Sequence, residues 1–496
     1  MQGSLKLKLL ASLGVALTAL TCSGFAQEEP FTAGTWTRIT NTPPFNASEP
    51  LLLTDGTVIV QEYGTSNWYK LTPDINGIYL NGTWSPIAPF PSNYGPLYYG
   101  TAVLADGRAI AEGGEYNFLQ SSFTNLGAIY DPKANTWTAI TPPPNGSGAG
   151  DVSSVVFPWG NWMVADVFNG ASAITNPSTC PPCTWTSIAG NGKADRNDEE
   201  GWNLLPDGSI LTTDAIDAPN SERYIATMQK WVSAGSTIVR LEDPNSQEIG
   251  PATLRPNGTV FATGACVESN STCTEPGHTS VYTISSGSWT PGPDFPNGLD
   301  IADGPASILP DGNVLVCTSP GLFVNGIQMF EYDGSSLHPT GNIANAASEP
   351  SYVVRFLALP SGGILETDGS TVVEIYKPSG TYNSAWQPKI TSFPQSVTRG
   401  QTYKISGTQF NGVSEGATYG DDAQMRTNYP LVRVTNNSTH HVKYWKTHNH
   451  STMGVQTGAA IVSTNFDVPS GAETGASQLV VVANGIPSNP VAITVH

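Results

Sequence analysis

The stretch LLPDGSILTTDA, residues 204–215, decides the fold because its pattern recurs along the chain. An apolar run reaches Pro-Asp-Gly, the chain turns, and a second apolar run follows. Asp-Gly between two apolar alternations is a strong signal of a β-hairpin, since glycine readily adopts the positive φ of a tight turn. Similar phrases begin at six other positions: Leu51, Ala102, Val155, Thr253, Ser307 and Leu357.

The spacing of the turn glycines defines a repeat. The glycines are Gly56, Gly107, Gly160, Gly208, Gly258, Gly312 and Gly362. Their separations lie near roughly 50 residues, a period typical of kelch repeats, in which four strands form one blade of a propeller. Seven copies therefore predict an all-β fold that contains a seven-bladed kelch-type β-propeller.

Tryptophans with the same period support this repeat. They occur in phrases such as GTWTRI at residues 34–39, each shortly before the next hairpin, where the outer strand of a blade is expected. The first phrase has no hairpin before it, and the hairpin of Gly362 has no such phrase after it. We therefore expect the N-terminal strand around Trp36 to complete the last blade, which would leave no open sheet edge. The tryptophans are Trp36, Trp84, Trp137, Trp185, Trp231 and Trp289.

The pattern changes near residue 386. From there on the hairpin period stops, and short alternating strands such as TYKISGTQF and SQLVVVANG follow. This pattern is typical of an immunoglobulin-like β-sandwich, here of the early-set type. We expect a signal peptide over 1–26, the propeller over 27–385 and the sandwich over 386–496.

The N-terminus indicates export from the cytoplasm. Lys6 and Lys8 precede an apolar run and a small-residue cleavage site, which is the pattern of a signal peptide. Cys22 could instead carry a lipid anchor. We expect a monomer that is secreted, periplasmic or at the cell surface, with no membrane span. The net charge of −19 argues against nucleic acid as a partner.

The cysteines fit an oxidising compartment. Cys266 and Cys273 flank a polar hairpin loop, and we expect them to pair. Cys180 and Cys183 could form a second, small-loop disulfide or a redox motif. Cys317 lies in an apolar run, which favours a buried thiol.

Acidic residues recur where the chain enters the first strand of each predicted blade. Six of the seven places carry a carboxylate. They are solvated surface acids, or they converge on the propeller axis, where they would raise one another's pKa and attract a proton, a cation or a polyhydroxy ligand. The residues at these places are Glu49, Tyr98, Tyr99, Asp151, Glu199, Glu200, Glu248, Asp303 and Glu349.

Several phrases resemble galactose oxidase and the related glyoxal oxidases. They are YVVRFLALPSGG from Tyr352, YGDDAQMRTNYPLVRV from Tyr419, KTHNHSTMGV from Lys446 and VVVANGIPSNPV from Val480. The resemblance implies a propeller with a sandwich domain, a copper ion on the axis and a tyrosine cross-linked to a cysteine. It also implies that a sandwich loop carrying a histidine enters the propeller.

The resemblance carries over only part of the copper ligand set. It places Tyr352 and His448 at ligand positions, whereas Val353 stands at the second histidine. Asp151 stands where the cross-linked tyrosine is expected, and Gly100 where its cysteine is expected. A Cys-Tyr copper radical is therefore not expected. A divalent metal held by His448, Tyr352 and Asp151 is one alternative.

These features suggest a secreted, carbohydrate-directed protein with an acidic axial pocket, whose partner is an extracellular sugar or another small polar ligand. Two carboxylates could hydrolyse a glycoside. Tyr352 and His448, with Arg355 binding a uronate, could instead abstract a proton. We expect His448 to project into the axis beside Tyr352 and Asp151. The alternatives are a copper-dependent oxidoreductase with an altered ligand set and a non-catalytic surface-binding propeller.

Overall fold

The computed structural model describes residues 31–144, 150–151, 153–269, 272–420 and 425–496. The expected signal peptide and Cys22 lie outside these residues. Ala33–His496 form one compact unit. The helices in the described residues are five 3-10 turns: η1 (Tyr79–Asn81), η2 (Pro177–Thr179), η3 (Pro296–Gly298), η4 (Ser351–Val353) and η5 (Ser384–Trp386). The fold is therefore all-β, as expected from the sequence.

Each of the seven sequence hairpins forms the first two strands of an antiparallel sheet. In the first three sheets the strands follow one another in space as they do in the chain. The first sheet contains β2 (Ala47–Leu52), β3 (Val58–Glu62), β4 (Trp68–Thr72) and β5 (Thr83–Ile87). The second contains β7 (Gly100–Val103), β8 (Ala109–Glu112), β11 (Gly127–Asp131) and β12 (Thr136–Ala139). The third contains β13 (Ser154–Val156), β14 (Trp162–Ala165), β15 (Ser172–Thr175) and β16 (Trp185–Ile188).

The next three sheets repeat this order. The fourth contains β17 (Asn203–Leu204), β18 (Ile210–Thr213), β19 (Asn220–Ile225) and β20 (Lys230–Ser236). The fifth contains β21 (Ala252–Leu254), β22 (Thr259–Thr263), β23 (Thr279–Thr283) and β24 (Ser288–Pro291). The sixth contains β25 (Ala306–Ile308), β26 (Val314–Thr318), β27 (Gln328–Tyr332) and β28 (Leu337–Pro339).

The seventh sheet takes its outer strand from the N-terminal part of the chain. It contains β29 (Arg355–Ala358), β30 (Ile364–Thr367), β31 (Val373–Lys377) and β1 (Thr35–Arg38). Trp36 pairs with Tyr376 in antiparallel register. The sequence prediction for the strand around Trp36 is thus confirmed. The other five repeating tryptophans also lie on outer strands: β5, β12, β16, β20 and β24.

The turns explain why the repeat is so regular. In the fourth sheet the Gly208 N–H donates to the carbonyl of Leu205 at 2.9 Å, and Gly208 has a φ of 80°. The carboxylate of Asp207 accepts the backbone N–H of Ser209 at 3.0 Å. Glycine therefore supplies the left-handed conformation, and aspartate fixes the turn.

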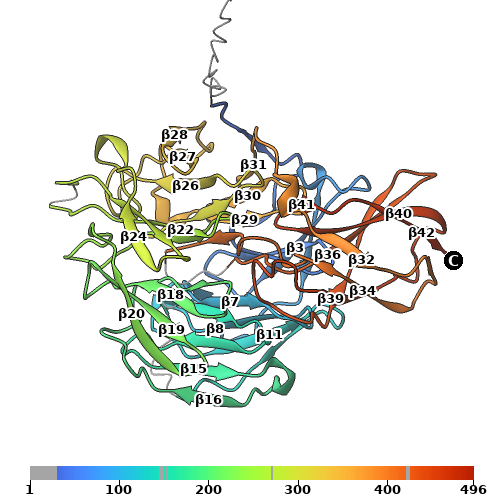
Figure 1. Ribbon diagram of the computed structural model, residues 1–496, viewed down its shortest axis with the longest axis horizontal. Helices are drawn as coiled ribbons and strands as arrows, with labels where there is room; N and C mark the ends of the chain where they lie inside the picture. Colours follow the sequence, from blue (N-terminus) through green and yellow to red (C-terminus); the bar gives the residue numbers. More distant parts are fainter. Residues whose placement is uncertain (1–30, 145–149, 152, 270–271, 421–424) are drawn as a thin grey trace, which may run out of the picture. The chain divides into compact units, whose positions relative to one another are not determined.

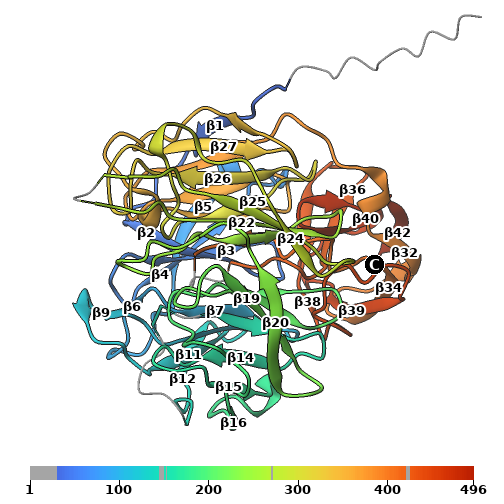
Figure 2. The same ribbon diagram turned by 60° about the vertical axis from the view of Figure 1, so that its left-hand side comes forward.

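Two further sheets follow in the C-terminal part of the chain. One contains β32 (Lys389–Ser392), β34 (Thr402–Thr408), β39 (Val462–Asp467) and β38 (Thr447–His448). The other contains β33 (Ser396–Val397), β42 (Val491–Val495), β40 (Gly475–Ala483), β36 (Leu431–Asn436), β37 (Val442–Trp445) and β41 (Ile486–Pro487). Their buried side chains, Phe410, Trp445 and Phe466 among them, form a separate hydrophobic core. These strands, orange to red, gather on one side of the repeating sheets in Figures 1 and 2.

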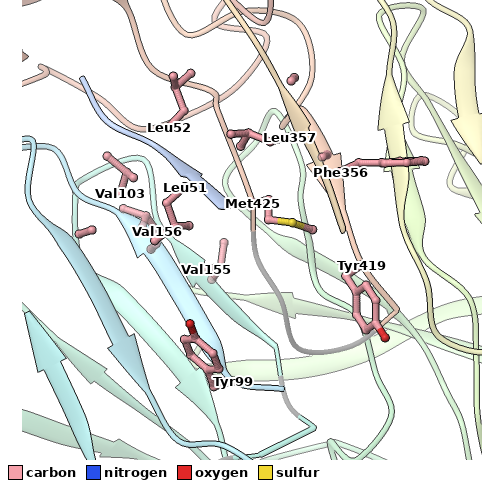
Figure 3. Packing of buried hydrophobic residues seen from close by; sticks show 14 of the residues in the cluster. Leu51, Leu52, Tyr99, Val103, Val155, Val156, Phe356, Leu357, Tyr419 and Met425 are labelled. Carbon is pink, nitrogen blue, oxygen red and sulfur yellow. The ribbon is translucent and has the colours of Figure 1, made fainter. Parts of the chain in front are cut away.

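One segment of the C-terminal part runs into the centre of the repeating sheets. Its strand β35 (Ala417–Thr418) pairs with the first strand of the sixth sheet, with Ala306 opposite Thr418. Figure 3 shows Tyr419 and Met425 of this segment among apolar side chains of several first strands, such as Val155 and Phe356. The segment thus fills the space between the sheets with buried side chains.

Candidate functional site

A cavity of about 510 Å³ opens at one end of the repeating sheets. Its lining is rich in carboxylates and aromatic rings. The residues that line it are Tyr63, Leu97, Tyr98, Glu115, Tyr116, Leu119, Asp151, Glu199, Glu248, Asp303, Phe323 and Tyr352. They come from separate sheets, so the fold brings together residues that lie far apart in the sequence.

Six of the residues singled out in the sequence line this cavity. They are Tyr98, Asp151, Glu199, Glu248, Asp303 and Tyr352. Each precedes the first strand of its sheet by two to four residues. The place just before the first strand of each repeat therefore identifies residues that line the same cavity.

The backbone at these places is strained in a recurring way. Tyr98, Asp151, Glu199 and Asp303 have φ values of 52°, 48°, 62° and 50°. Side chains other than glycine rarely adopt this left-handed conformation, and it tends to be retained where function requires it. The repetition in four loops indicates that the conformation directs these side chains into the cavity.

Three of the carboxylates form the closest group. Glu199, Glu248 and Asp303 each place one oxygen within 4.8 Å of the other two. Burial raises the pKa of Glu248 to about 7, and the negative charges of Asp151 and Glu115 add to the effect. Near neutral pH Glu248 is therefore partly protonated.

The inserted segment passes directly against this group. A Cβ atom on Gly420 would lie 2.6 Å from Oδ1 of Asp303 and 3.1 Å from the carbonyl oxygen of Ile249. A Cβ on Gly201 would lie 2.4 Å from the carbonyl oxygen of Gly420. Glycine is thus required on both sides of this close approach.

Aromatic rings form the rest of the wall. Phe323 lies edge-on to Tyr352, with the ring centroids 5.4 Å apart, and Tyr98 lies edge-on to Tyr116 at 6.0 Å. Burial raises the pKa of Tyr352, and the neighbouring Glu115 raises that of Tyr116. Both phenols are therefore protonated at neutral pH and can donate hydrogen bonds.

Arg355 lies behind this wall rather than in the cavity. Its Nε is 3.5 Å from a carboxylate oxygen of Glu49, and both side chains are buried. Its guanidinium covers the ring of Tyr419 at 3.7 Å and lies 5.2 Å from the ring of Tyr98. Arg355 and Glu49, which the sequence assigned to a ligand site, therefore do not line this cavity.

Two other predicted residues point away from the cavity. Tyr99 is buried and donates its hydroxyl to Gln61 at 2.5 Å. Glu200 is buried and forms an ion pair with Lys193 at 2.8 Å. Each directly follows a cavity residue with a left-handed backbone, Tyr98 or Glu199, and at this turn of the chain the two adjacent side chains point in different directions. Glu349, the seventh place, is half-buried and does not line the cavity.

His448 lies elsewhere, and the expectation that it reaches the axis is wrong for this structure. It belongs to β38, which pairs with β39, and its Nε2 is 3.1 Å from the carboxylate of Asp467. The segment that enters the sheets instead contains Tyr419 and Met425. The sequence phrases of both segments resembled the same family, and the wrong one was assigned to the axis.

The sequence reasoning also missed part of the lining. Glu115, Tyr116 and Leu119 lie in an insertion between β8 and β11 that carries the short strands β9 (Tyr116–Asn117) and β10 (Gln120–Ser121), next to β6 (Pro96–Leu97). Phe323 lies in the long loop after β26. Both loops exceed what a tight hairpin needs, and that extra length was the available signal.

The cavity does not fit the copper site that the family resemblance implies. Its described ligand atoms are oxygens of carboxylates and phenols, and no histidine or cysteine is among the described lining residues. Copper(II) favours nitrogen donors such as imidazole, whereas oxygen-only sets suit magnesium, calcium or manganese.

The expected cysteine pairs are both present. Cys266 is bonded to Cys273 and Cys180 to Cys183, while Cys317 is a buried free thiol. Among the described residues, no helix has the length and apolar character needed to cross a membrane.

Comparison with known proteins supports the fold alone. No family model and no curated protein matches the chain. A fungal alcohol oxidase of the AA5 family, solved with copper, is 15% identical over 94% of this chain and 99% of its own, with a TM-score of 0.52. A virginiamycin B lyase from Staphylococcus aureus, solved with quinupristin, is 10% identical over 69% of this chain and 99% of its own, with a TM-score of 0.47. The chain therefore has a propeller-like, galactose oxidase-like fold.

Proposed function

We propose that the cavity binds an extracellular carbohydrate and acts on it by acid–base chemistry rather than by copper radical oxidation. The observation that carries this proposal is the lining itself, in which five carboxylates and five aromatic rings surround a cavity of about 510 Å³. Carboxylates accept hydrogen bonds from sugar hydroxyls, and aromatic faces pack against the apolar faces of sugar rings. A cavity of this size holds a small ligand of one or two sugar rings.

Glu248 is the proposed acid. With a pKa of about 7 it is partly protonated at neutral pH, so it can give its proton to the oxygen of a glycosidic bond. An ionised neighbour, Glu199 or Asp303, then stabilises the positive charge that develops on the sugar ring, and water completes the hydrolysis. Their oxygens lie within 4.8 Å of one another, close to the separation of roughly 5–5.5 Å found in retaining glycosidases.

We further infer that residues 27–385 form a closed seven-bladed kelch-type propeller and residues 386–496 an early-set sandwich. In support, the first strands β2 and β7, β21 and β25, and β25 and β29 are neighbours, and β29 returns to β2. The seventh sheet is bonded to the first, since the hydroxyl of Thr367 donates to the carbonyl of Ser48 at 2.7 Å. Export by a signal peptide over 1–26 is part of the proposal, and the two disulfides fit it.

Sugar binding and hydrolysis can be tested together on the full chain. Calorimetric titration with galactose, glucose and glucuronate measures binding, and release of nitrophenol from 4-nitrophenyl glycosides measures hydrolysis. Glu248→Gln should lower hydrolysis by roughly a hundredfold or more while leaving sugar binding within a few fold. Glu62→Gln, at the end of β3 and outside the cavity lining, is the matched control and should change neither.

Three other results would change the proposed function. Saturable sugar binding without hydrolysis by any glycoside would reduce the proposal to a binding protein. Oxidation of a primary alcohol with peroxide release by the copper-loaded chain would establish the altered-ligand oxidase and overturn the acid–base proposal. No saturable binding of any sugar tested would overturn the carbohydrate proposal itself.

A further inference from the structure

The fifth hairpin differs from the other six at one buried position of the repeat. This position lies three residues before the turn glycine of each hairpin. In the fifth hairpin it is occupied by Arg255, which is 7% exposed. Its backbone makes the usual turn bonds. The Arg255 N–H donates to the carbonyl of Thr259 at 2.7 Å, and the Gly258 N–H donates to the carbonyl of Arg255 at 3.1 Å. The other six hairpins place buried apolar side chains there: Leu53, Leu104, Phe157, Leu205, Leu309 and Leu359.

Burial of this guanidinium needs a physical reason, because a buried charge is costly unless it is paired. Its Nε and Nη2 donate to the carbonyl of Gly312 at 3.2 and 3.1 Å, and Nη2 also donates to the carbonyl of Asp333 at 2.9 Å. The guanidinium lies 5.0 Å from the centre of the Tyr332 ring. Within the described residues no carboxylate forms an ion pair with it, although Asp311 and Asp333 are near enough to favour its charged form.

Asp333, one of these two acids, is already bonded to other groups. The carboxylate of Asp333 accepts the backbone N–H groups of Ser335 at 2.7 Å and Ser336 at 2.9 Å, and it bonds to the ring of His338 at 2.7 Å. The guanidinium is therefore held in place by neutral carbonyls and an aromatic face. Nη1 makes no hydrogen bond to any described residue.

Arg255 instead lines a second cavity, of about 290 Å³, between the fifth and sixth sheets. This cavity shares no residue with the acidic cavity. Space for the guanidinium depends on Gly334, because a Cβ atom there would lie 2.8 Å from Nη1. Other polar side chains also line this cavity: Asn257, Thr259, Thr290 and Ser335. The hydroxyls of Thr259 and Ser335 already donate to Asn257 at 2.7 Å and to Asp333 at 2.9 Å, which leaves the amide of Asn257 and the hydroxyl of Thr290 as further donors.

We propose that this second cavity binds a small oxyanion, with Arg255 as its anchor. A guanidinium is the side chain best suited to planar oxyanions, and the bond is strengthened by charge. Carboxylate and sulfate groups share this chemistry. The group comes either from a free inorganic anion or from an acidic sugar, and the size of the cavity admits both.

The test titrates the full chain with sodium sulfate, sodium glucuronate and neutral glucose at constant ionic strength. Wild type should bind an anion saturably and should not bind glucose in this cavity. Arg255→Leu restores the residue that five other hairpins use, so it should fold with an unchanged or higher thermal midpoint. It should lose roughly tenfold to a hundredfold in anion affinity. Arg38→Leu, which removes one exposed positive charge, should bind as wild type does.

The outcomes separate the two sources of the anion. The binding that Arg255→Leu loses is the binding in this cavity. If that part is tighter for glucuronate than for sulfate, the group belongs to an acidic sugar, and the reverse assigns an inorganic or sulfate-ester group. Equal binding by wild type and Arg255→Leu, or no saturable anion binding by wild type, would show that Arg255 only packs the two sheets. Arg255→Met, which keeps most of the side-chain length, provides the same comparison if the leucine variant does not fold.

Discussion

The two ends of the repeating sheets follow opposite rules. At the turn end, each hairpin closes with glycine, and the C-terminal part of the chain binds the turns through backbone groups. The N–H groups of Thr447, His450 and Met453 donate to the carbonyls of Thr54, Ala105 and Pro158 at 3.1, 3.0 and 2.9 Å. At the cavity end, the loops have unequal lengths, left-handed residues and acidic side chains.

This difference separates stability from function. The regular end is covered by neighbouring chain, and backbone N–H and carbonyl groups are paired across this contact, as a packed domain contact requires. The irregular end leaves carboxylates near one another, which costs stability and is retained where a ligand compensates. The comparison predicts that substitutions at the covered end act on folding and that those at the cavity end act on binding and on pH dependence.

The largest expected effect is in the inserted segment that packs between the sheets, from Arg426→Ala. Arg426 is ion-paired with buried Glu415 at 2.8 Å and donates to the carbonyl of Ser154 at 2.6 Å. Removal of one partner leaves a buried charge unpaired, which typically destabilises by about 3–5 kcal/mol. Urea denaturation of the full chain measures this loss. The exposed Lys404→Ala should change the free energy of unfolding by less than about 0.5 kcal/mol.

The double variant Glu415→Leu with Arg426→Met sharpens the result. Replacing both charges by apolar groups should recover much of the lost stability, because no buried charge is left without a partner. A single variant as stable as wild type would show that the inserted segment does not anchor the sheets, and the contrast between the two ends would fail.

The covered end was also the end that the sequence predicted well. Pro-Asp-Gly at Gly208 and its copies fixed the hairpins because turn chemistry is local. The strand around Trp36 could be assigned to the seventh sheet because the last repeat lacked an outer strand of its own. The buried pair of Glu415 and Arg426 could not be predicted, since it depends on how a distant segment enters the sheets.

At the cavity end the prediction was right in position and wrong in detail. Asp151, Glu199 and Asp303 share the cavity because they occupy the same place in each repeat. Glu200 was assigned to the ligand as well, although it faces the other way and pairs with Lys193. Periodicity locates a place in the chain, but the backbone conformation decides which of two adjacent side chains faces the cavity.

The next effect in size is a pH dependence at the cavity end. In the folded chain the pKa of Glu248 is raised to about 7. The protonated form of Glu248 stabilises the folded chain. This stabilisation is fully present below the pKa of Glu248 in the unfolded chain and is lost as pH rises through about 7. Glu248→Gln cannot lose a proton, so from about pH 5 to about pH 8 it should gain on wild type by on the order of 3 kcal/mol. The urea denaturation midpoints of wild type and Glu248→Gln across this pH range measure the difference. If Glu248 were solvated, the two plots of midpoint against pH would stay parallel.

The smallest expected effect is from His448→Ala, and it tests which segment serves the site. His448 is paired with Asp467, whose side chain is 43% exposed, and such half-exposed pairs contribute about 0–1 kcal/mol. We expect a change of that size in the free energy of unfolding at neutral pH, with sugar binding by the cavity unchanged. Asp467→Asn removes the same pair from the other side and should act alike. Loss of sugar binding in His448→Ala but not in Asp467→Asn would place His448 at the ligand after all. The site would then depend on the C-terminal strands, and not only on the cavity end of the sheets.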